Sequence, residues 1–506
     1  MTTATSTGYN LHTCPPIHHD LYIPTLSTQF DEHLLRSLFL LFLAIPLTYL
    51  ISNEFIRRAA RIKEFIGSTN WLLVGNIPDI RFNAAEKYRQ QSKIYGDVYQ
   101  IQLGNIPVIV VNSTKAAKKI FGQNSQALSS RPIFRTFHKV LSNSVGTTIG
   151  TSPFNESLRR RRKGAASALN KPSIATYIGH LDVETKDFTL QRLSFSLALT
   201  LNWGTRMGSG DGPMFHKITE VEEIISKFRS TTSNLQDYIP ILPLNPLSFG
   251  SKKAREMRDR RDVYLKRLNK GLDDCMEKGI RRPCIQANVI LDKEASLNKK
   301  ELTSINLTML SGGLDTMTTL VQWSVALLAQ RPDTQTKAIE AIREFYTDEE
   351  PLCNPLDDQK CAHIAAMVRE FLRYYCVLRL AFPRATVKDV NYEGKLIPAG
   401  NPKIWADPEV FRPERWLEQS DAPLFTYGLG YRMCAGSLLA NRELYLVFLR
   451  MLNRSEILQD SEVETHPVLG SADPTSLVTK RVQGSPCGVN STRKDGNKGH
   501  VYPLTS

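Results

Sequence analysis

Apolar positions along most of the chain recur at the spacing of helices. From about residue 114 to 345, Leu and Ala alternate with Lys and Glu at this period, interrupted by the proline-rich stretch at 239–250. Residues 363–380 predict a further helix, and residues 434–452 predict an amphipathic one. The pattern therefore predicts a fold built mainly from helices.

Two shorter regions have the composition of strands. Residues 95–113 contain two β-rich runs that are broken at Gly104-Asn105, which predicts a hairpin. Residues 386–400 predict further short strands. Because the sequence contains no internal repeat, we expect one mixed domain, mainly α with a minor β region.

One apolar segment, at residues 34–52, is long and nearly uncharged. It is at the short end for a bilayer span, which needs roughly 20 residues. Acidic residues precede it and basic residues follow it, so the positive-inside rule predicts a cytoplasmic C-terminal part. A cleaved signal peptide is the alternative, but the segment starts far from Met1 and no small-residue cleavage site follows. We therefore expect a membrane anchor.

The chain is basic, with 64 Lys and Arg against 50 Asp and Glu in 506 residues, a net charge of +14. Such an excess suits nucleic acid, an anionic membrane or an acidic protein. No zinc-finger or RNA-binding motif accompanies it, so we expect the membrane and a protein partner and no nucleic acid. The eight cysteines contain no CxxC pair, which favours reduced thiols in a cytosol-like compartment.

The sequence YGLGYRMCAGS, at 427–437, surrounds one thiol with glycines and a cation. Cys434 stands at the start of a predicted helix, whose N-terminus stabilises a thiolate. Gly430 and Gly436 would let the backbone approach a bulky flat group, and Arg432 offers a cation for a carboxylate. A lone cysteine cannot hold zinc. A nucleophile or a structural cysteine stays possible, but an axial ligand to haem iron explains the glycines and the arginine together.

The same loop resembles the FxxGxRxCxG motif of cytochrome P450 monooxygenases. Four residues fall on this pattern, while Tyr427 replaces the family's phenylalanine: Gly430, Arg432, Cys434 and Gly436. The resemblance implies the cytochrome P450 fold, haem b with Cys434 as the iron ligand, and electrons from an NADPH-cytochrome reductase. It also implies a single-pass anchor in the endoplasmic reticulum membrane. The expected organisation is a tail at 1–33, the anchor at 34–52, the haem-thiolate monooxygenase domain at 60–483 and an atypical tail at 484–506.

A second motif resembles the ExxR helix of the family. Glu370 and Arg373 are three residues apart, so they share one helix face and can pair. By itself this is a common surface ion pair. Arg415, in FRPERW, matches the family's third partner, and the resemblance implies a network of the three residues that fixes the cysteine loop to the core.

A third motif, SGGLDTMTT at 311–319, lies within the helical region. Each glycine in a helix costs about 1 kcal/mol relative to alanine, which suggests local loosening or a closely approaching ligand. Asp315 and Thr316 could relay protons, the acid as the source and the hydroxyl as the guide. With Gly312 and Gly313 they match the family's AGxDT-type motif. A helix bend with solvated polar groups is the alternative.

The resemblance also implies arginines that bind the haem propionates. Arg432 and Arg384 stand where the family places them. Arg161 is a further candidate, although Ser157 occupies the position where the family usually has tryptophan. We expect the other basic residues of 159–163 to form a solvated face for an acidic reductase or for lipid headgroups.

Within the family, residues 129–140, 149–163 and 285–295 and the SGGLDT motif are similar to fungal phenylacetate and hydroxyphenylacetate hydroxylases. This similarity implies hydroxylation of a small aromatic substrate, a phenylacetate-like acid or a phenol. The residues expected at the substrate pocket are Phe134, Phe137, His138, Gly312 and Gly313. Ordinary packing is the alternative for each of them.

Three stretches depart from the family pattern. Only four residues, 401–404, separate IPAG from WADP, where the family has a longer connection. Residues 67–75 lack a proline-rich hinge, and 484–506 is polar where the family has a final strand. Two further functions therefore stay open: a non-catalytic or decayed haem-binding paralogue, and a secondary-metabolism oxidase acting on an aromatic polyketide.

Overall fold

The chain divides into two compact units, residues 1–56 and 57–506. A computed structural model describes residues 26–144, 146–186, 190–206, 212–230, 235–242, 249–280, 282–347, 350, 352–357, 359–398, 411–420, 422, 424–459, 462–467, 487–490 and 501–503. The short connection expected at 401–404 lies outside these residues.

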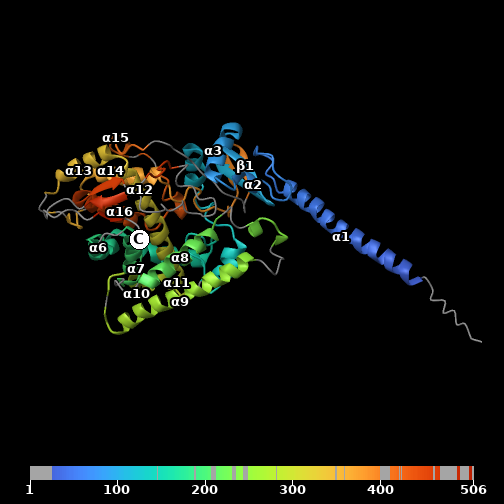
Figure 1. Cartoon of the computed structure of the whole chain (residues 1–506), viewed down its shortest axis with the longest axis horizontal. Helices are drawn as coiled ribbons and strands as arrows, with labels where there is room; N and C mark the ends of the chain where they lie inside the picture. The colour runs from blue at the N-terminus through green and yellow to red at the C-terminus, as the bar shows by residue number, and fades with distance from the viewer. Residues whose placement is uncertain are drawn as a thin grey trace, which may run out of the picture. The chain divides into compact units, whose positions relative to one another are not determined.

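The first unit contains most of helix α1 (Leu26–Ala59), drawn as a long blue helix in Figure 1. Among the described residues, 33–59 is the one stretch long and apolar enough to cross a membrane. The predicted anchor at 34–52 lies inside it, and its large apolar side chains are exposed. A helix is suited to a lipid bilayer because all its interior backbone groups are hydrogen-bonded within the segment.

The second unit is mainly helical, as expected from the apolar periodicity. Its α-helices are α2 (Ile77–Ile80), α3 (Ala84–Tyr95), α4 (Thr114–Ala117), α5 (Glu156–Ala168), α6 (Lys171–Lys186), α7 (Leu190–Trp203), α8 (Gly212–Lys227), α9 (Phe249–Glu277), α10 (Ile285–Leu291), α11 (Lys299–Ser311), α12 (Met317–Ala329), α13 (Pro332–Arg343), α14 (Ala362–Tyr374), α15 (Arg415–Glu418) and α16 (Ser437–Arg454). Shorter turns are the π-helical η1 (Lys118–Gln123), η2 (Arg135–Leu141) and η7 (Gly312–Thr316), and the 3-10 turns η4 (Leu235–Asp237), η6 (Lys293–Ala295) and η8 (Gly430–Arg432).

The centre of this unit is the run α11–η7–α12. Asn298 and Glu301 form a capping box that satisfies the free N–H groups at the start of α11. Every residue of α12 is buried, in keeping with its almost uniformly apolar sequence. Figure 1 shows α12 beside α14 and α16, and these three helices share one hydrophobic core.

Within the described ranges, the minor β region forms three small sheets. Strands β1 (Val98–Leu103) and β2 (Ile106–Val111) pair antiparallel, which confirms the predicted hairpin. Strands β3 (Val390–Tyr392) and β4 (Lys395–Ile397) also pair antiparallel, within the predicted 386–400 region. The third sheet has the order β5 (Glu456–Gln459), β6 (Cys487–Asn490) and β7 (Val501–Pro503).

Two predicted helix boundaries, and the expectation for residues 484–506, differ from the structure. Helix α14 ends at Tyr374 and not near 380, because Tyr375 leaves the helical region at φ −99° and ψ 67°. Helix α16 begins at Ser437 and not at 434, with Gly436 as its N-cap. Residues 484–506 were expected to lack a strand, yet β6 and β7 lie there, since β6 supplies the hydrogen-bonding partner of β5.

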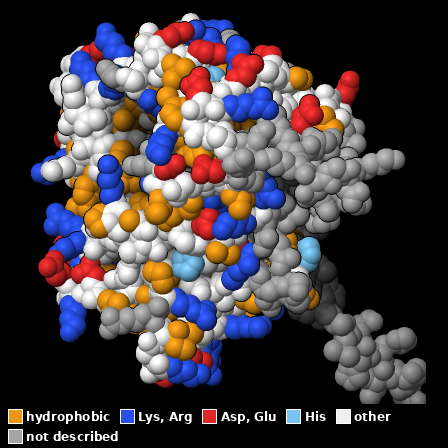
Figure 2. Space-filling model, turned by 90° about the vertical axis from the view of Figure 1, so that its left-hand side faces the viewer, with side chains coloured by type: hydrophobic (Ala, Val, Ile, Leu, Met, Phe, Trp, Pro, Cys, Tyr) orange, Lys and Arg blue, Asp and Glu red, His pale blue; other side chains and the backbone are white. Residues whose placement is uncertain are grey.

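The charge excess does not gather on the face shown in Figure 2. Lys and Arg side chains there are interspersed with Asp and Glu, and hydrophobic side chains lie between them. This mixed surface is typical of a solvated globular protein.

Candidate active site

Cys434 lies in the loop between η8 and α16. Its backbone N–H donates to the carbonyl of Tyr427 at 2.8 Å, and the Tyr427 hydroxyl lies 2.9 Å from Asn441 Oδ1, so both ends of the loop are fixed. The Cys434 side chain is exposed, although protein atoms surround it closely enough that burial raises the pKa of its thiol. The Gly436 N–H and the charge of Arg162 oppose this shift. A cation bound at the sulfur would be needed to hold the thiolate firmly.

The glycines of this loop serve two different purposes. Gly430 has φ +60°, and a Cβ there would lie 2.8 Å from the Phe121 carbonyl oxygen and 2.4 Å from Ser125 Cβ. Glycine is therefore required at 430 by the backbone and by packing, apart from any clearance for a flat group. At Gly436 a Cβ would meet only Cys434 Sγ, at 4.0 Å, so this glycine keeps the space beside the sulfur open.

Arg432 and Arg384 converge on the same loop, together with Arg131. Arg432 donates to the carbonyls of Ser129 at 2.6 Å and Ile149 at 2.9 Å. Arg384 Nη2 donates to the Leu429 carbonyl at 2.6 Å, while its Nη1 is buried without a hydrogen-bond partner among the described residues.

Arg131 was not singled out by the sequence, because nothing in a single sequence marks an arginine as buried. Its Nε donates to the Gly150 carbonyl at 3.0 Å, and its Nη1 donates to the carbonyl of Pro383 at 2.8 Å. Pro383 directly precedes Arg384. These bonds hold Arg131 beside Arg432 and Arg384, and with Arg162 these three residues form what we call the arginine group.

The arginine group is electrostatically unbalanced. Burial and the neighbouring positive charges lower the pKa of Arg432 to about 9 and that of Arg384 to about 10, and they lower the pKa of Arg131 as well. Arg162 contributes to all three shifts. Among the described residues, no carboxylate forms an ion pair with any of these four side chains. Because buried cations need counter-charges, this group fits a ligand with more than one carboxylate.

The basic run at 159–163 is only partly a solvated face. Arg159 and Lys163 are exposed, as expected. Arg160 keeps 38% of its side chain exposed while it pairs with the buried Glu301 at 2.6 Å. The expectation is wrong for Arg162, which is half-buried and donates to the Met433 carbonyl at 3.1 Å. Packing of α5 against the cysteine loop and α11 covers this side of the helix.

Arg161, the candidate from the family register, is buried on another side of α5. It donates to Ser304 Oγ at 2.6 Å and to the Thr147 carbonyl at 2.7 Å. Its charge still contributes to the lowered pKa of Arg432. Arg161 therefore lies within electrostatic reach of the arginine group, but Arg162 is coupled to more of its members.

The glycine motif forms a π-helical turn, η7, between α11 and α12. The Thr316 hydroxyl donates to the carbonyl of Gly312, one turn earlier. Gly312 is exposed and a Cβ there would meet open space, whereas a Cβ on Gly313 would lie 3.2 Å from Ala198 Cβ. Asp315 is buried and Thr316 half-buried. A widened turn beside open space is the local loosening that the glycines predict.

Three of the expected pocket residues, Phe134 at the N-cap of η2 and Phe137 and His138 within it, have different surroundings. Phe134 and Phe137 are buried, and Phe134 packs edge-on against Tyr238 with ring centroids 6.4 Å apart. His138 Nδ1 lies 2.9 Å from the Phe134 nitrogen and 3.0 Å from the Phe134 carbonyl oxygen, and Nε2 lies 3.1 Å from the Thr151 carbonyl oxygen. Burial lowers the pKa of His138. Both ring nitrogens are thus used by the backbone, and His138 has no spare polar atom for a ligand.

The side chain of Arg229 contacts both Phe137 and the residue that precedes the glycine turn. The guanidinium of Arg229 lies 5.3 Å from the Phe137 ring centroid and also donates to Ser311 Oγ at 3.1 Å. Ser311 directly precedes Gly312. The structure therefore brings η2 and η7 to one place.

Glu370, Arg373 and Arg415 form one network around the buried Glu370 carboxylate. Arg373 donates two hydrogen bonds to the Glu370 carboxylate, each 2.8 Å long, and Arg415 Nε lies 3.2 Å from it. Trp416 Nε1 donates to the same carboxylate at 2.9 Å, a partner that the sequence motif does not reveal. The network fixes α15 to α14, the helix that also accepts a hydrogen bond from Thr426, just before the cysteine loop.

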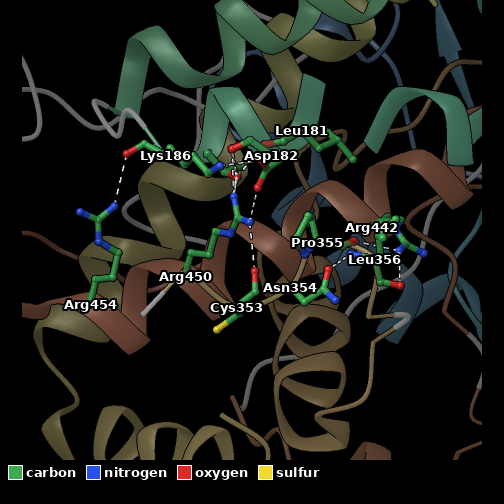
Figure 3. Close-up of polar contacts among 11 residues, drawn as sticks. Leu181, Asp182, Lys186, Cys353, Asn354, Pro355, Leu356, Arg442, Arg450 and Arg454 are labelled. Carbon is green, nitrogen blue, oxygen red and sulfur yellow. Dashed lines mark hydrogen bonds and ion pairs between the residues drawn. The ribbon is translucent and has the colours of Figure 1, made fainter. Parts of the chain in front are cut away.

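Another buried arginine, Arg450, fixes the helix that follows the cysteine loop. Arg450 of α16 reaches α6, where it pairs with Asp182 at 2.6 Å and donates to Thr185 Oγ1 at 2.6 Å (Figure 3). It also donates to the Cys353 carbonyl at 3.1 Å. Charge-assisted hydrogen bonds of this kind fix the position of α16. They thereby also fix the position of Cys434, two residues before the N-cap of this helix.

Comparison with known proteins gives a family match and similar relatives over most of the chain. Residues 66–485 match the cytochrome P450 family. The chain is 63% identical to the 3-hydroxyphenylacetate 6-hydroxylase of Emericella nidulans over 479 residues, which cover 88% of this chain and 93% of that protein. It is 35% identical to the phenylacetate 2-hydroxylase of the same organism over 450 residues, or 81% and 86% of the two chains. A cytochrome P450 monooxygenase of Mycosarcoma maydis is 33% identical over 474 residues, 85% and 87% of the two chains.

Proposed function

The chain belongs to the cytochrome P450 family, and on that premise we propose that it hydroxylates 3-hydroxyphenylacetate on the ring carbon para to the existing hydroxyl. It is a haem-thiolate monooxygenase that acts on small aromatic acids with O2 and electrons from a reductase. The observation that carries the proposal is the 63% identity to a 3-hydroxyphenylacetate 6-hydroxylase over 88% of the chain. This identity disfavours both the decayed paralogue and the polyketide oxidase.

The residues at the cysteine loop fit haem. We assign the iron to Cys434, with Gly436 keeping the space beside the sulfur open. The propionates are assigned to the arginine group, where Arg384 Nη1 is a buried donor without a partner among the described residues. Two carboxylates would supply the negative charge that Arg432, Arg384 and Arg131 lack. When bound, haem activates O2 and transfers one oxygen atom to the substrate.

Proton delivery is assigned to Thr316 and Asp315. The Thr316 hydroxyl lies on the widened turn, one helical turn from the open face at Gly312, and it can rotate from the Gly312 carbonyl toward that space. Buried Asp315 is the neighbouring acid. Such a pair can pass protons inward while the packed helices around it exclude bulk water.

The membrane and reductase assignments are part of the same proposal. The exposed apolar surface of α1 supports a single-pass anchor in the endoplasmic reticulum membrane, with the large unit on the cytoplasmic side. An NADPH-cytochrome reductase is the proposed electron donor. Its acidic surface would meet exposed basic side chains such as Arg159 and Lys163.

The proposal is tested with the full chain in microsomes that contain its reductase. The reduced protein should give the red-shifted Soret band of a thiolate-ligated haem with carbon monoxide, and NADPH should convert 3-hydroxyphenylacetate to the para-hydroxylated product. Cys434→Ala should lose both signals, while Cys275→Ser, a matched change on α9, should keep them. A wild type without the band would refute haem-thiolate ligation. A wild type with the band that oxidises none of the arylacetates would refute the substrate.

A further inference from the structure

We propose that the Arg229 guanidinium binds the carboxylate of the aromatic acid and so determines that the enzyme accepts acids over neutral aromatics. This inference rests on the proposed function, because it concerns the substrate of the same site. It adds a residue that no motif of the sequence indicates. Arg229 follows the C-terminal end of α8, at a position where the chain carries no recognisable pattern.

The first argument is the hydrogen bonding of Arg229. Its side chain is 9% exposed, so its N–H groups need partners inside the protein. Nη2 donates to Ser311 Oγ at 3.1 Å, but Nε is buried and has no hydrogen-bond partner among the described residues. A guanidinium presents its donors in a planar fork, and a carboxylate is the group that matches this fork.

The second argument is that the nearest carboxylate is already engaged elsewhere. Glu222 Oε2 is 3.8 Å from Arg229 Nη2, which gives electrostatic attraction without a hydrogen bond. Its two oxygens accept instead from the Tyr264 hydroxyl at 2.6 Å and the Ser311 hydroxyl at 2.8 Å. Burial and the Glu222 charge raise the pKa of Tyr264, so its hydroxyl remains a donor. Glu222 thus holds the cluster in place and leaves Arg229 Nε without an acceptor among the described residues.

The third argument is position. Arg229 bonds to Ser311, the residue before exposed Gly312, and its guanidinium lies over the Phe137 ring at 5.3 Å. The arginine therefore joins the two segments that carry the expected pocket residues. An arylacetate has one aromatic ring and one carboxylate, separated by a single carbon. A cation held next to phenylalanine and to an open helix face offers both complementary surfaces.

The test compares an acid with its neutral amide. Binding of 3-hydroxyphenylacetate and 3-hydroxyphenylacetamide to the haem-loaded full chain is measured from the substrate-induced shift of the Soret band, together with KM and kcat for the acid. Arg229→Gln should weaken binding of the acid by about 10- to 100-fold, the usual range for losing hydrogen bonds to a charged group, and raise KM more than it lowers kcat. Its affinity for the amide should change by less than about threefold.

The control is Arg260→Gln on α9, an arginine that pairs with the exposed Glu220 at 2.5 Å on the solvent side of the same helix pair. It should leave both affinities unchanged. Equal weakening of acid and amide in Arg229→Gln would overturn the inference and mark a merely structural arginine. If that variant loses haem, Arg229→Lys is the deciding variant, because it keeps the positive charge but lacks the planar fork of N–H donors. The inference then requires that Arg229→Lys discriminates between acid and amide less than the wild type does. Undiminished discrimination overturns the inference. A wild type that binds neither compound would instead refute the proposed substrate.

Discussion

At the scale of single residues, the energetic cost of the buried Glu370 carboxylate depends on its neighbours. Its carboxylate is fully buried, and Arg373, Arg415 and Trp416 direct N–H groups at it. A buried charge of this kind is tolerated only while its partners remain, because removal of one partner leaves an uncompensated charge that costs about 3–5 kcal/mol.

We therefore expect Glu370→Gln to lower the free energy of unfolding by about 3–5 kcal/mol and to reduce the haem-loaded fraction. Chemical denaturation followed by fluorescence measures the first, and the carbon monoxide spectrum measures the second. The matched control is Glu418→Gln, since Glu418 pairs with Arg412 at 2.7 Å with both side chains about half exposed. It should cost less than about 1 kcal/mol. Equal losses in the two variants would show that burial of the network does not matter.

The sequence identifies residues of the site where a motif fixes their spacing, and it misses those that packing selects. Glu370 and Arg373 are three residues apart on one helix, so their pairing is local. Arg131 bonds to Gly150 and Pro383, and Arg162 of α5 bonds to Met433 of the cysteine loop, so both join the arginine group only through contacts between segments far apart in the sequence. Within a run of basic residues, no local signal separates half-buried Arg162 from exposed Arg159.

At the scale of elements, the two adjacent glycines of η7 have separate reasons to be glycine. A methyl group at Gly313 would press on Ala198 of α7 at 3.2 Å, whereas one at Gly312 would enter open space. The first glycine therefore borders the expected substrate space, and the second permits close packing of two helices.

This difference predicts opposite effects for two alanine variants. Gly312→Ala should keep or raise stability, since alanine favours a helix by about 1 kcal/mol, but it should weaken substrate binding. In Gly313→Ala the same gain in helix propensity should be offset by overpacking, which costs about 1–3 kcal/mol. This variant should change substrate binding less than Gly312→Ala does. Thermal unfolding and substrate-induced Soret shifts of both variants measure the two effects. The explanation fails if Gly312→Ala is the less stable variant.

Helix boundaries show why the element pattern was predictable and its limits were not. Apolar residues continue past the end of α14, because Tyr375 and Val377 are buried outside the helix as well. Periodicity reports burial and not backbone conformation, so it extends the helix to 380. At α16 the opposite happens: the N–H of Cys434 bonds to Tyr427 across the loop, and the helix starts only after Gly436. Caps of this kind depend on long-range contacts.

At the scale of the whole molecule, the proposed anchor and the haem domain should be separable functions. Deleting residues 2–49 removes most of the exposed apolar part of α1 and keeps Arg57, whose carbonyl accepts a hydrogen bond from Gln102 within the second unit. The second unit has its own hydrophobic cores. We expect the shortened chain to bind haem with an unchanged carbon monoxide spectrum, and to be released from membranes by alkaline carbonate, which leaves the full chain in place.

Release by alkaline carbonate is the sharper measurement because exposed Ile66, Trp71 and Phe82 would still permit peripheral contact with lipid after the deletion. Deleting residues 2–32 is the control: it removes the chain that precedes the candidate span but keeps the whole span at 33–59, so carbonate should not release it. A full chain that carbonate extracts would refute the anchor. If the 2–49 deletion variant resists extraction, the membrane attachment lies in the second unit. If the same variant loses the carbon monoxide spectrum, the haem domain needs the N-terminal segment to fold.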